Sequence, residues 1–428
     1  MSVQLQQTEI GQFPSDWEIN RVDSAFDIQQ GKQVSSRNRE GVHQRPFLRT
    51  KNVFWNRLEL TDLDEMHFSE AEQNRLELCV NDLLVCEGGS IGRTALWNKE
   101  VEGCLYQNHL HRLRVKDQKA DAQFSAYWLW YAFDVAKLYF GRGNVTTIPN
   151  LSQSKLAELP IALPPLPEQK KIAHILSAVQ RAIEAQERII QTTTELKKAL
   201  IYKLFTEGLR GEPQKQTEIG PVPESWEVVR CEVVCDTISV GIVVKPSSYY
   251  VKDGVPAFRS QNVREDRIQP EPMVYISEEA NQGPVKKSKL SAGDVLIVRT
   301  GYPGTSCVVP PEFEGSNCID LIFVRPNKGK LRSHYLSRFF NSDAAKVQVQ
   351  AGKIGLAQQH FNVGAVKNTK MPLAPTDQQD EIVAQLELVD SKHDLVTAKR
   401  NALQDLFRTL LHELMTAKTR VHQLEGNS

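Results

Sequence analysis

Mostly apolar positions recur at alternating intervals of four and three residues in two segments of the chain. The first segment has this pattern at Ile172, Leu176, Val179, Ile183, Gln186, Ile190, Thr193, Lys197, Leu200 and Leu204. The second segment repeats it 210 residues later, at Ile382, Leu386, Val389, His393, Val396, Arg400, Leu403, Phe407, Leu410 and Leu414. Such spacing is typical of the contact line of a coiled coil, so each segment predicts a long helix that can pair with the other.

Proline and glycine predict where the first long helix begins and ends. Residues 164–167 read Pro-Pro-Leu-Pro, which suits a helix start, and Glu168 favours the positive N-terminal end of a helix. Gly208, Gly211 and Pro213 stop the helix. A segment of about 38 residues spans roughly 57 Å, enough for a spacer between two domains. The same pattern also fits helices that hold a homodimer or an ordinary core together.

The whole chain is a tandem duplication. Thr8-Glu9-Ile10-Gly11 returns as Thr217-Glu218-Ile219-Gly220, and the segment 46–53 returns as 256–263. The match continues through Asp82 to Gly92 against Asp294 to Gly304 and into both long helices. Two copies of about 210 residues exceed the length of solenoid repeats, so each copy is a globular domain followed by a helix.

Each globular part is predicted to be α/β. Short β-branched and apolar runs at 82–86, 110–115, 294–298 and 319–324 alternate with turns that carry glycine or proline. An aromatic-rich helix is expected over 124–140, with 333–348 as its counterpart. The pattern does not give the strand order.

Composition narrows the class of protein. The chain has 428 residues, with 40% hydrophobic and 24% charged residues, and no apolar stretch approaches the roughly 18 residues of a membrane span. The first residues lack a secretory signal, so a cytoplasmic location is expected. The seven cysteines form no CxxC pair and are expected to be free thiols. A protein that binds DNA alone usually carries a basic surplus that neutralises the phosphates. The zero net charge therefore argues against DNA binding by this chain alone, unless partner proteins contact part of the phosphates.

Several motifs suggest catalysis but favour simpler explanations. His109 and His111 alternate along a strand without an obvious third metal ligand, so strand packing is preferred. The segment 88–94 is glycine-rich but lacks a P-loop ending, which favours a tight turn. Glu168-Gln169-Lys170 has the ExK spacing of some nucleases, yet it opens a helix. Neither an [N/D]PP[Y/F] tetrapeptide nor an FxGxG cofactor loop of an adenine methyltransferase is present.

Basic residues cluster instead in the segment 31–57, which holds seven of them against one acid and also carries Phe54-Trp55. Arg and Lys suit phosphate or guanine, Asn and Gln suit adenine, and aromatic rings offer stacking faces. The equivalent segment, 241–267, differs in its charges, which predicts that the two copies read different sequences. Glycine-bearing loops at 141–147 and 351–355 are second candidate contacts. The predicted DNA contacts are Lys32, Arg37, Arg39, Arg49, Lys51, Asn52, Trp55, Arg142, Asn144, Lys245, Arg259, Gln261, Asn262, Arg299, Tyr302 and Lys353.

Three segments together resemble the specificity subunits of Type I restriction-modification systems. They are the ten residues from Leu163 to Ile172 (LPPLPEQKKI), the junction 204–211 (LFTEGLRG), and the start of the second copy at 217–226 (TEIGPVPESW). The second helix departs from the family's LPPLxEQ pattern at 374–379, which leaves open whether both helix starts dock a partner equally.

The resemblance implies an α/β (α+β) fold with two tandem target-recognition domains separated by two long antiparallel coiled-coil helices and related by pseudo-two-fold symmetry. The expected boundaries are 1–160 and 217–370 for the recognition domains, 161–207 and 371–420 for the helices, 208–216 for the linker and 421–428 for the tail. It also implies recognition of a bipartite double-stranded DNA site.

The same resemblance implies that this chain is not an enzyme and binds no cofactor. Two methyltransferase subunits and the restriction subunits would use S-adenosylmethionine, ATP and Mg²⁺. Two other classes compete with this interpretation. A duplicated protein- or glycan-binding scaffold is disfavoured by the basic segment 31–57, and a self-sufficient methyltransferase or nuclease is disfavoured by the missing motifs.

Overall fold

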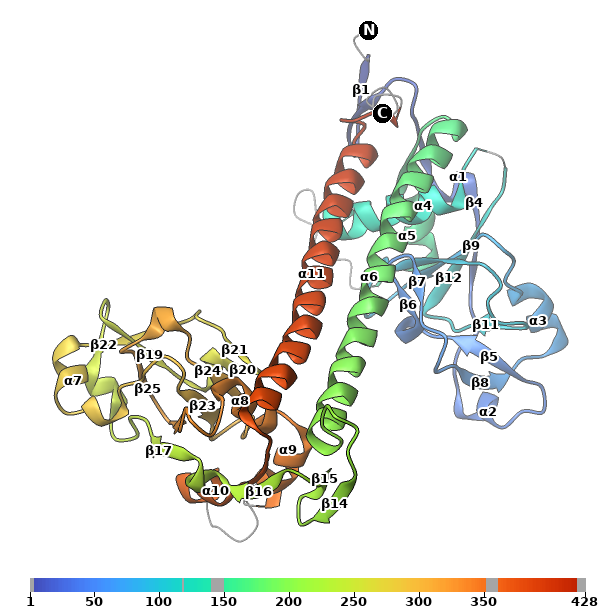
Figure 1. Cartoon of the computed structure of the whole chain (residues 1–428). Coiled ribbons are helices and arrows are strands. Elements are labelled where there is room, and N and C mark those ends of the chain that lie inside the picture. Colours follow the sequence, from blue (N-terminus) through green and yellow to red (C-terminus); the bar gives the residue numbers. More distant parts are fainter. Residues whose placement is uncertain (1–3, 118, 140–149, 352–360, 422–428) are drawn as a thin grey trace. The chain divides into compact units, whose positions relative to one another are not determined.

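The computed structural model describes residues 4–117, 119–139, 150–351 and 361–421. The chain divides into two compact units (Figure 1). Unit 1 comprises residues 1–187 and 399–428, and unit 2 comprises residues 188–398. Both division points fall inside the two longest helices, α6 (Leu166–Thr206) and α11 (Thr376–Met415). Each unit therefore holds one globular domain and a part of each long helix.

The globular domain of unit 1 is built on two small sheets. One sheet has the strand order β10-β9-β12-β4 with all neighbours antiparallel, and the other has the order β11-β5-β8, in which β11 and β5 are parallel. Short hairpins β1-β2 and β6-β7 and the pair β3-β13 complete the domain. The strands are β1 (Leu5–Thr8), β2 (Gly11–Pro14), β3 (Glu18–Arg21), β4 (Phe26–Gln30), β5 (Gln44–Leu48), β6 (Val53–Phe54), β7 (Arg57–Leu58), β8 (Asp64–His67), β9 (Asp82–Cys86), β10 (Thr94–Trp97), β11 (Leu105–Tyr106), β12 (Leu110–Val115) and β13 (Pro160–Leu163). The helices are α1 (Val22–Ala25), α2 (Ser36–Arg39), α3 (Glu70–Leu76), α4 (Ala122–Trp130) and α5 (Gln153–Glu158).

Unit 2 repeats this architecture. Its sheets have the orders β17-β26-β23-β24 and β18-β22-β19-β25, with hairpins β14-β15 and β20-β21 and the pair β16-β27. The strands are β14 (Gln214–Thr217), β15 (Gly220–Pro223), β16 (Glu227–Arg230), β17 (Cys235–Val240), β18 (Tyr250–Val251), β19 (Val255–Phe258), β20 (Val263–Arg264), β21 (Arg267–Ile268), β22 (Val274–Ile276), β23 (Val295–Val298), β24 (Ser306–Val308), β25 (Asn317–Cys318), β26 (Leu321–Pro326) and β27 (Lys370–Leu373). The helices are α7 (Glu278–Gln282), α8 (Ser333–Phe340), α9 (Asp343–Ala351) and α10 (Val363–Asn368). The predicted α/β class and duplication are confirmed.

The long helices run antiparallel within each unit. In unit 2, Arg210 just beyond α6 pairs with Glu381 near the start of α11 at 2.8 Å, and Lys197 pairs with Asp390 at 2.7 Å. In unit 1, Arg420 just beyond α11 pairs with Glu168 near the start of α6 at 2.7 Å. All twenty positions of the predicted contact line are buried or partly buried, as the spacing predicted. Arg420 lies 210 residues after Arg210, so equivalent arginines pair with an acidic residue near the start of the facing helix, although the two acidic residues are at different positions of the repeat.

A buried glutamine attaches the start of each long helix to its domain. Gln169 accepts a hydrogen bond from the backbone N–H of Asp121 at 2.8 Å and donates to the carbonyls of Lys119 and Pro164, both at 2.7 Å. Gln379 makes the same contacts in unit 2, where it accepts from the N–H of Arg332 at 2.8 Å. Both side chains are fully buried. The two helix starts therefore have the same internal construction despite their different sequences.

Two helix bounds differ from the sequence expectation. The aromatic helix expected over 124–140 ends as an α-helix at Trp130, continues as a π-helical turn over Tyr131–Val135, and is followed by Lys137 at a φ of +51°. Its counterpart is interrupted between α8 and α9. There Asn341 bonds to the N–H and carbonyl of Ser306 on β24, both at 3.0 Å, and thereby holds the end of α8 against the sheet.

Candidate nucleic-acid interface

A short turn after β5 and after β19 has the same construction in both units. In unit 1, Asn52 accepts a hydrogen bond from the N–H of Arg49 at 2.9 Å and donates to the carbonyl of Glu59 at 2.9 Å. In unit 2, Asn262 accepts from the N–H of Arg259 at 2.9 Å, and its side-chain amide lies 3.0–3.5 Å from three carbonyls further along the chain. Both asparagines are buried. Their amides shape the turn, and contact with a base, which stays a prediction, would require these bonds to break.

Carboxylates neutralise three of the predicted basic contacts of unit 1, namely Lys32, Arg49 and Lys51. Hydrogen bonding to Arg49 is the main cause of the lowered pKa of Asp64, and the nearby Lys51 contributes to it. The acidic partners follow the basic residues by 11 to 40 positions, so the local cluster in the sequence did not reveal them. The ion pairs are Arg49–Asp64 at 2.6 Å, Lys51–Asp62 at 2.7 Å and Lys32–Glu72 at 2.6 Å.

Aromatic residues of the same segment lie against α4 and α11. Trp55 is stacked on Trp130, with ring centroids 5.9 Å apart and an interplanar angle of 8°, and Trp130 in turn contacts Phe407. Trp55 therefore packs inside unit 1, and its predicted stacking on DNA is not tested. The neighbouring Phe54 ring carries two guanidinium groups, from Arg57 at 5.0 Å and Arg93 at 5.2 Å. Neither arginine is among the DNA contacts predicted from the sequence.

Unit 2 presents a different set of side chains. Lys245 and Gln261 are exposed, and Tyr302 is 84% exposed on the turn between β23 and β24. Gln261 donates to the carbonyl of Pro272 at 3.2 Å, and the guanidinium of Arg299 pairs with Asp320 at 2.6 Å. The predicted contacts of unit 2 are thus spread over several loops.

Four predicted contacts cannot be placed. Arg142, Asn144 and Lys353 lie outside the described residues, together with residues 141–147 and 352–355 of the two glycine-bearing loops. The side chain of Arg37 is also outside them, whereas Arg39 is exposed in α2.

The motifs that suggested catalysis have structural roles in unit 1. His111 is buried and its Nε2 lies 2.9 Å from the carbonyl of Leu151, while His109 lies 3.6 Å from Glu87. The glycine-rich segment forms the turn between β9 and β10, where Gly89 and Gly92 have φ values of +73° and +79°. The described residues contain no group of three His, Cys, Asp or Glu side chains arranged to hold a metal ion. The seven cysteines are free, and none of the described helices is long and apolar enough to cross a membrane.

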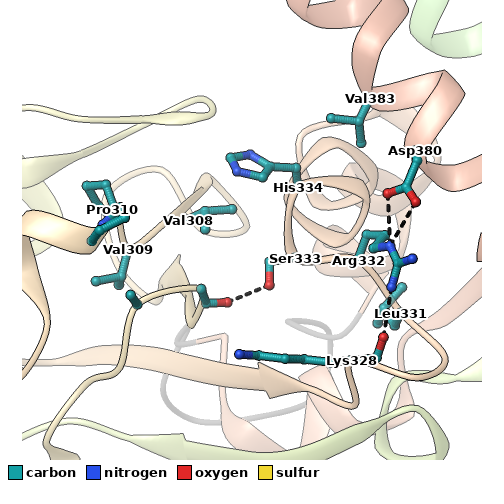
Figure 2. Close-up of a pocket in the computed structure, with 13 residues that line it drawn as sticks. Val308, Val309, Pro310, Lys328, Leu331, Arg332, Ser333, His334, Asp380 and Val383 are labelled. Carbon is teal, nitrogen blue, oxygen red and sulfur yellow. Dashed lines mark hydrogen bonds and ion pairs between the residues drawn. The ribbon is translucent and has the colours of Figure 1, made fainter.

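A hollow of about 520 Å³ lies beside the start of α11 in unit 2 (Figure 2). Figure 2 shows Arg332 bonded to Asp380 at 2.8 Å and Ser333 bonded to the carbonyl of Gly293 at 2.6 Å. None of the predicted DNA contacts lines this hollow, so it is not part of the candidate interface.

Solved structures of similar fold cover nearly the whole chain. The S subunit of the Type I restriction-modification system of M. genitalium matches with a TM-score of 0.57 and 17% sequence identity, over 93% of this chain and 96% of that one. A chain from a study of complex assembly and conformational transition in the type I R-M system matches with a TM-score of 0.57 and 18% identity, over 95% and 99% of the two chains. These matches show the fold.

Sequence comparison gives the family. The putative type I restriction enzyme MjaX specificity subunit of Methanocaldococcus jannaschii is 25% identical over 97% of both chains. The type I restriction enzyme EcoBI specificity subunit of Escherichia coli is 22% identical over 75% of this chain and 69% of its own length. The model of the Type I restriction modification DNA specificity domain matches twice, at residues 14–194 and 223–405. The chain therefore belongs to the family of Type I restriction-modification DNA specificity subunits.

Proposed function

We propose that the chain reads a bipartite DNA site, with one half-site read by the domain of each unit. The observation that carries this proposal is the turn shared by both units. Its buried asparagine, Asn52 or Asn262, is the same, whereas the exposed residue before it is Lys51 in one unit and Gln261 in the other. The two turns thus share one backbone structure but expose different hydrogen-bond donors. Two domains that recognise different DNA sequences require such a difference.

In this proposal, basic side chains leave their internal ion pairs and bind DNA phosphates instead. Arg49 and Lys51 are partly exposed while paired with Asp64, so a phosphate can replace the carboxylate without unfolding the turn. Each replacement leaves a carboxylate near the DNA, which weakens binding by this chain alone. Zero net charge then fits a protein whose partners share the phosphates.

The chain has a non-catalytic role in this proposal and works in the cytoplasm within a larger complex. The supporting observation is that its relatives are named specificity subunits of type I restriction enzymes. Two methyltransferase subunits and the restriction subunits would supply the chemistry with S-adenosylmethionine, ATP and Mg²⁺. Apolar side chains stay exposed on the long helices and offer a surface for such partners, namely Ile189, Leu196, Tyr202, Leu388, Leu395 and Leu406.

Footprinting of the chain copurified with its methyltransferase partner tests the proposal. We expect protection of two short DNA segments with an unprotected spacer between them. Lengthening α6 by two turns within residues 172–204 is expected to change the spacer that is methylated. A single continuous footprint, or a complex that binds all DNA sequences equally, would contradict the proposal.

A further inference from the structure

The turn between β6 and β7 and its counterpart between β20 and β21 bind the long helices within their own units. Asn56 and Asp266 occupy equivalent positions at the tips of these turns, with φ values of +48° and +60°. The N–H of Asn56 donates to the carbonyl of Thr94, and that of Asp266 donates to the carbonyl of Ser306, both at 2.8 Å. The backbones of the two turns are therefore held by equivalent hydrogen bonds. The turns differ in the side chains at their tips.

In unit 1 the residues that join the turn to the helices are uncharged, although Gln180 also donates to the carboxylate of Glu184 on α6 at 3.1 Å. Asn56 donates from Nδ2 to the side-chain oxygen of Gln180 on α6 at 2.9 Å, and Gln180 donates back to the carbonyl of Asn56 at 3.1 Å. The Tyr127 hydroxyl donates to the same oxygen of Gln180 at 2.9 Å. Phe407 of α11 packs on the rings of Tyr127 and Trp130, with centroids 6.0 and 4.9 Å away. Amide hydrogen bonds and aromatic packing therefore join this domain to the helices.

In unit 2 the same contact is ionic. Arg338 of α8 pairs with Asp266 and with Asp390 of α11, both at 2.5 Å. Lys197 of α6 lies 2.7 Å from Asp390 and 3.6 Å from Asp266. The side chains of Arg338 and Asp266 are only 5% and 8% exposed. Two cations and two carboxylates thus neutralise one another in a largely buried site.

Four members of each network occupy equivalent positions in the duplication. The repeat offset of 210 or 211 residues is fixed by the buried glutamines Gln169 and Gln379 and by the backbone N–H groups that bind them. With the residue of unit 1 given first and that of unit 2 second, the corresponding pairs are Asn56/Asp266, Tyr127/Arg338, Gln180/Asp390 and Phe407/Lys197. The first two pairs belong to the domains, and the last two belong to the helices.

Exchanging the partners would break the ion pair between Arg338 and Asp390 and the contact between Lys197 and Asp266, and would leave each of the four charges with a single counterion. A domain carrying Asp266 and Arg338 would meet Gln180 and Phe407, and a domain carrying Asn56 and Tyr127 would meet Asp390 and Lys197. Arg338, whose side chain is 5% exposed, would then face uncharged groups in place of Asp390, and the loss of a counterion in a largely buried site is destabilising because the desolvated charge is less well compensated. Each domain therefore matches only its own helix positions.

We propose that these four pairs of positions assign each recognition domain to its place on the helices. The helix residues Gln180 and Phe407 accept the first domain, and Asp390 and Lys197 accept the second. This assignment fixes the order of the two domains along the chain, whatever DNA sequence each of them reads. Replacing a domain by one built for the other position then requires a change of two helix residues.

A full-length chimera tests the assignment. Residues 217–373 are replaced by a second copy of residues 8–163, either on the native helices or on helices with Lys197→Phe and Asp390→Gln. Hydrogen exchange is measured by mass spectrometry at the transplanted turn, residues 53–58, and at strand β9 as a control for folding. On native helices we expect the turn to exchange at least tenfold faster than the same turn at its own position. On the substituted helices we expect a return to within about threefold.

Two results would overturn the assignment. One is equally slow exchange of the transplanted turn on both sets of helices. The other is fast exchange on both sets while β9 stays protected. DNA binding is not measured, so failure of the proposed DNA recognition would leave this test unaffected.

If the chimera does not fold, variants of the native chain test whether these positions assign each domain to its helix residues. Asp266→Asn with Arg338→Tyr gives the domain of unit 2 the residues of unit 1. Lys197→Phe with Asp390→Gln does the same for the helices. Each double variant is expected to speed exchange of residues 263–268 at least tenfold, and all four substitutions together are expected to recover most of the protection. Additive effects of the two conversions would contradict the assignment.

Discussion

Replacing Gln169 by methionine tests whether the buried glutamine attaches α6 to its domain. The substitution keeps the side-chain volume and removes three hydrogen bonds, to the N–H of Asp121 and to the carbonyls of Lys119 and Pro164. At about 1 kcal/mol for each bond, the free energy of unfolding of unit 1 should fall by about 3 kcal/mol. For a unit of this size the melting temperature should fall by roughly 6–12 °C.

Calorimetry of the full chain measures the loss, and hydrogen exchange at the Asp121 amide locates it. Gln191→Met is the matched control, because Gln191 is exposed and bonds only to Glu195 one helical turn away, at 3.0 Å. It should change stability by less than about 0.5 kcal/mol. Gln379→Met should reproduce the effect in unit 2, at the Arg332 amide. Losses of stability no larger than that of the control in both buried variants would show that these glutamines do not attach the long helices to their domains.

Three further predictions concern charge and exposure. Asp64→Asn releases Arg49 and should tighten non-specific DNA binding roughly threefold at 0.1 M salt, as measured by fluorescence anisotropy; unchanged or weaker binding would argue against phosphate contacts here. Hydrogen bonding to Arg420 lowers the pKa of Asp16, so this pair stabilises unit 1 above the ordinary Asp value of 3.8 and the contribution disappears as the pH falls below it. Arg420→Ala should therefore lower the melting temperature more at pH 6 than at pH 3, and an equal loss at both would disprove the linkage. Tyr302→Ala should weaken specific DNA binding at least about fivefold and leave the melting temperature unchanged; full affinity would exclude Tyr302 from the interface.

Periodic and repeated features of the chain were predictable from the sequence. Strands β9 and β12 have the predicted bounds, 82–86 and 110–115, because short apolar runs between turn residues leave few alternatives. The contact line of the long helices follows from the alternating spacing, even where Thr193 or Lys197 takes an apolar position. The duplication then gave the architecture of unit 2 from that of unit 1. The predicted domain boundaries remain predictions, since the compact units divide both long helices.

The sequence did not reveal whether the candidate contact residues are free, paired or covered by other side chains, because this depends on residues distant in the sequence. Lys32 is neutralised by Glu72, 40 positions away, and the ring of Trp55 is covered by Trp130. A local count of basic and aromatic residues cannot include such partners. Likewise, Asn52 was selected for its amide, which pairs with adenine in DNA complexes but here closes a turn.

The central claim is that each domain reads one half of a two-part DNA site. The most direct measurement is long-read mapping of methylated adenines in cells that carry the methyltransferase partner with either the native chain or a chain whose residues 1–150 come from another family member. We expect one half of the methylated sequence to change, while the other half and the spacer stay the same. A change in both halves, or in neither, would contradict the central claim.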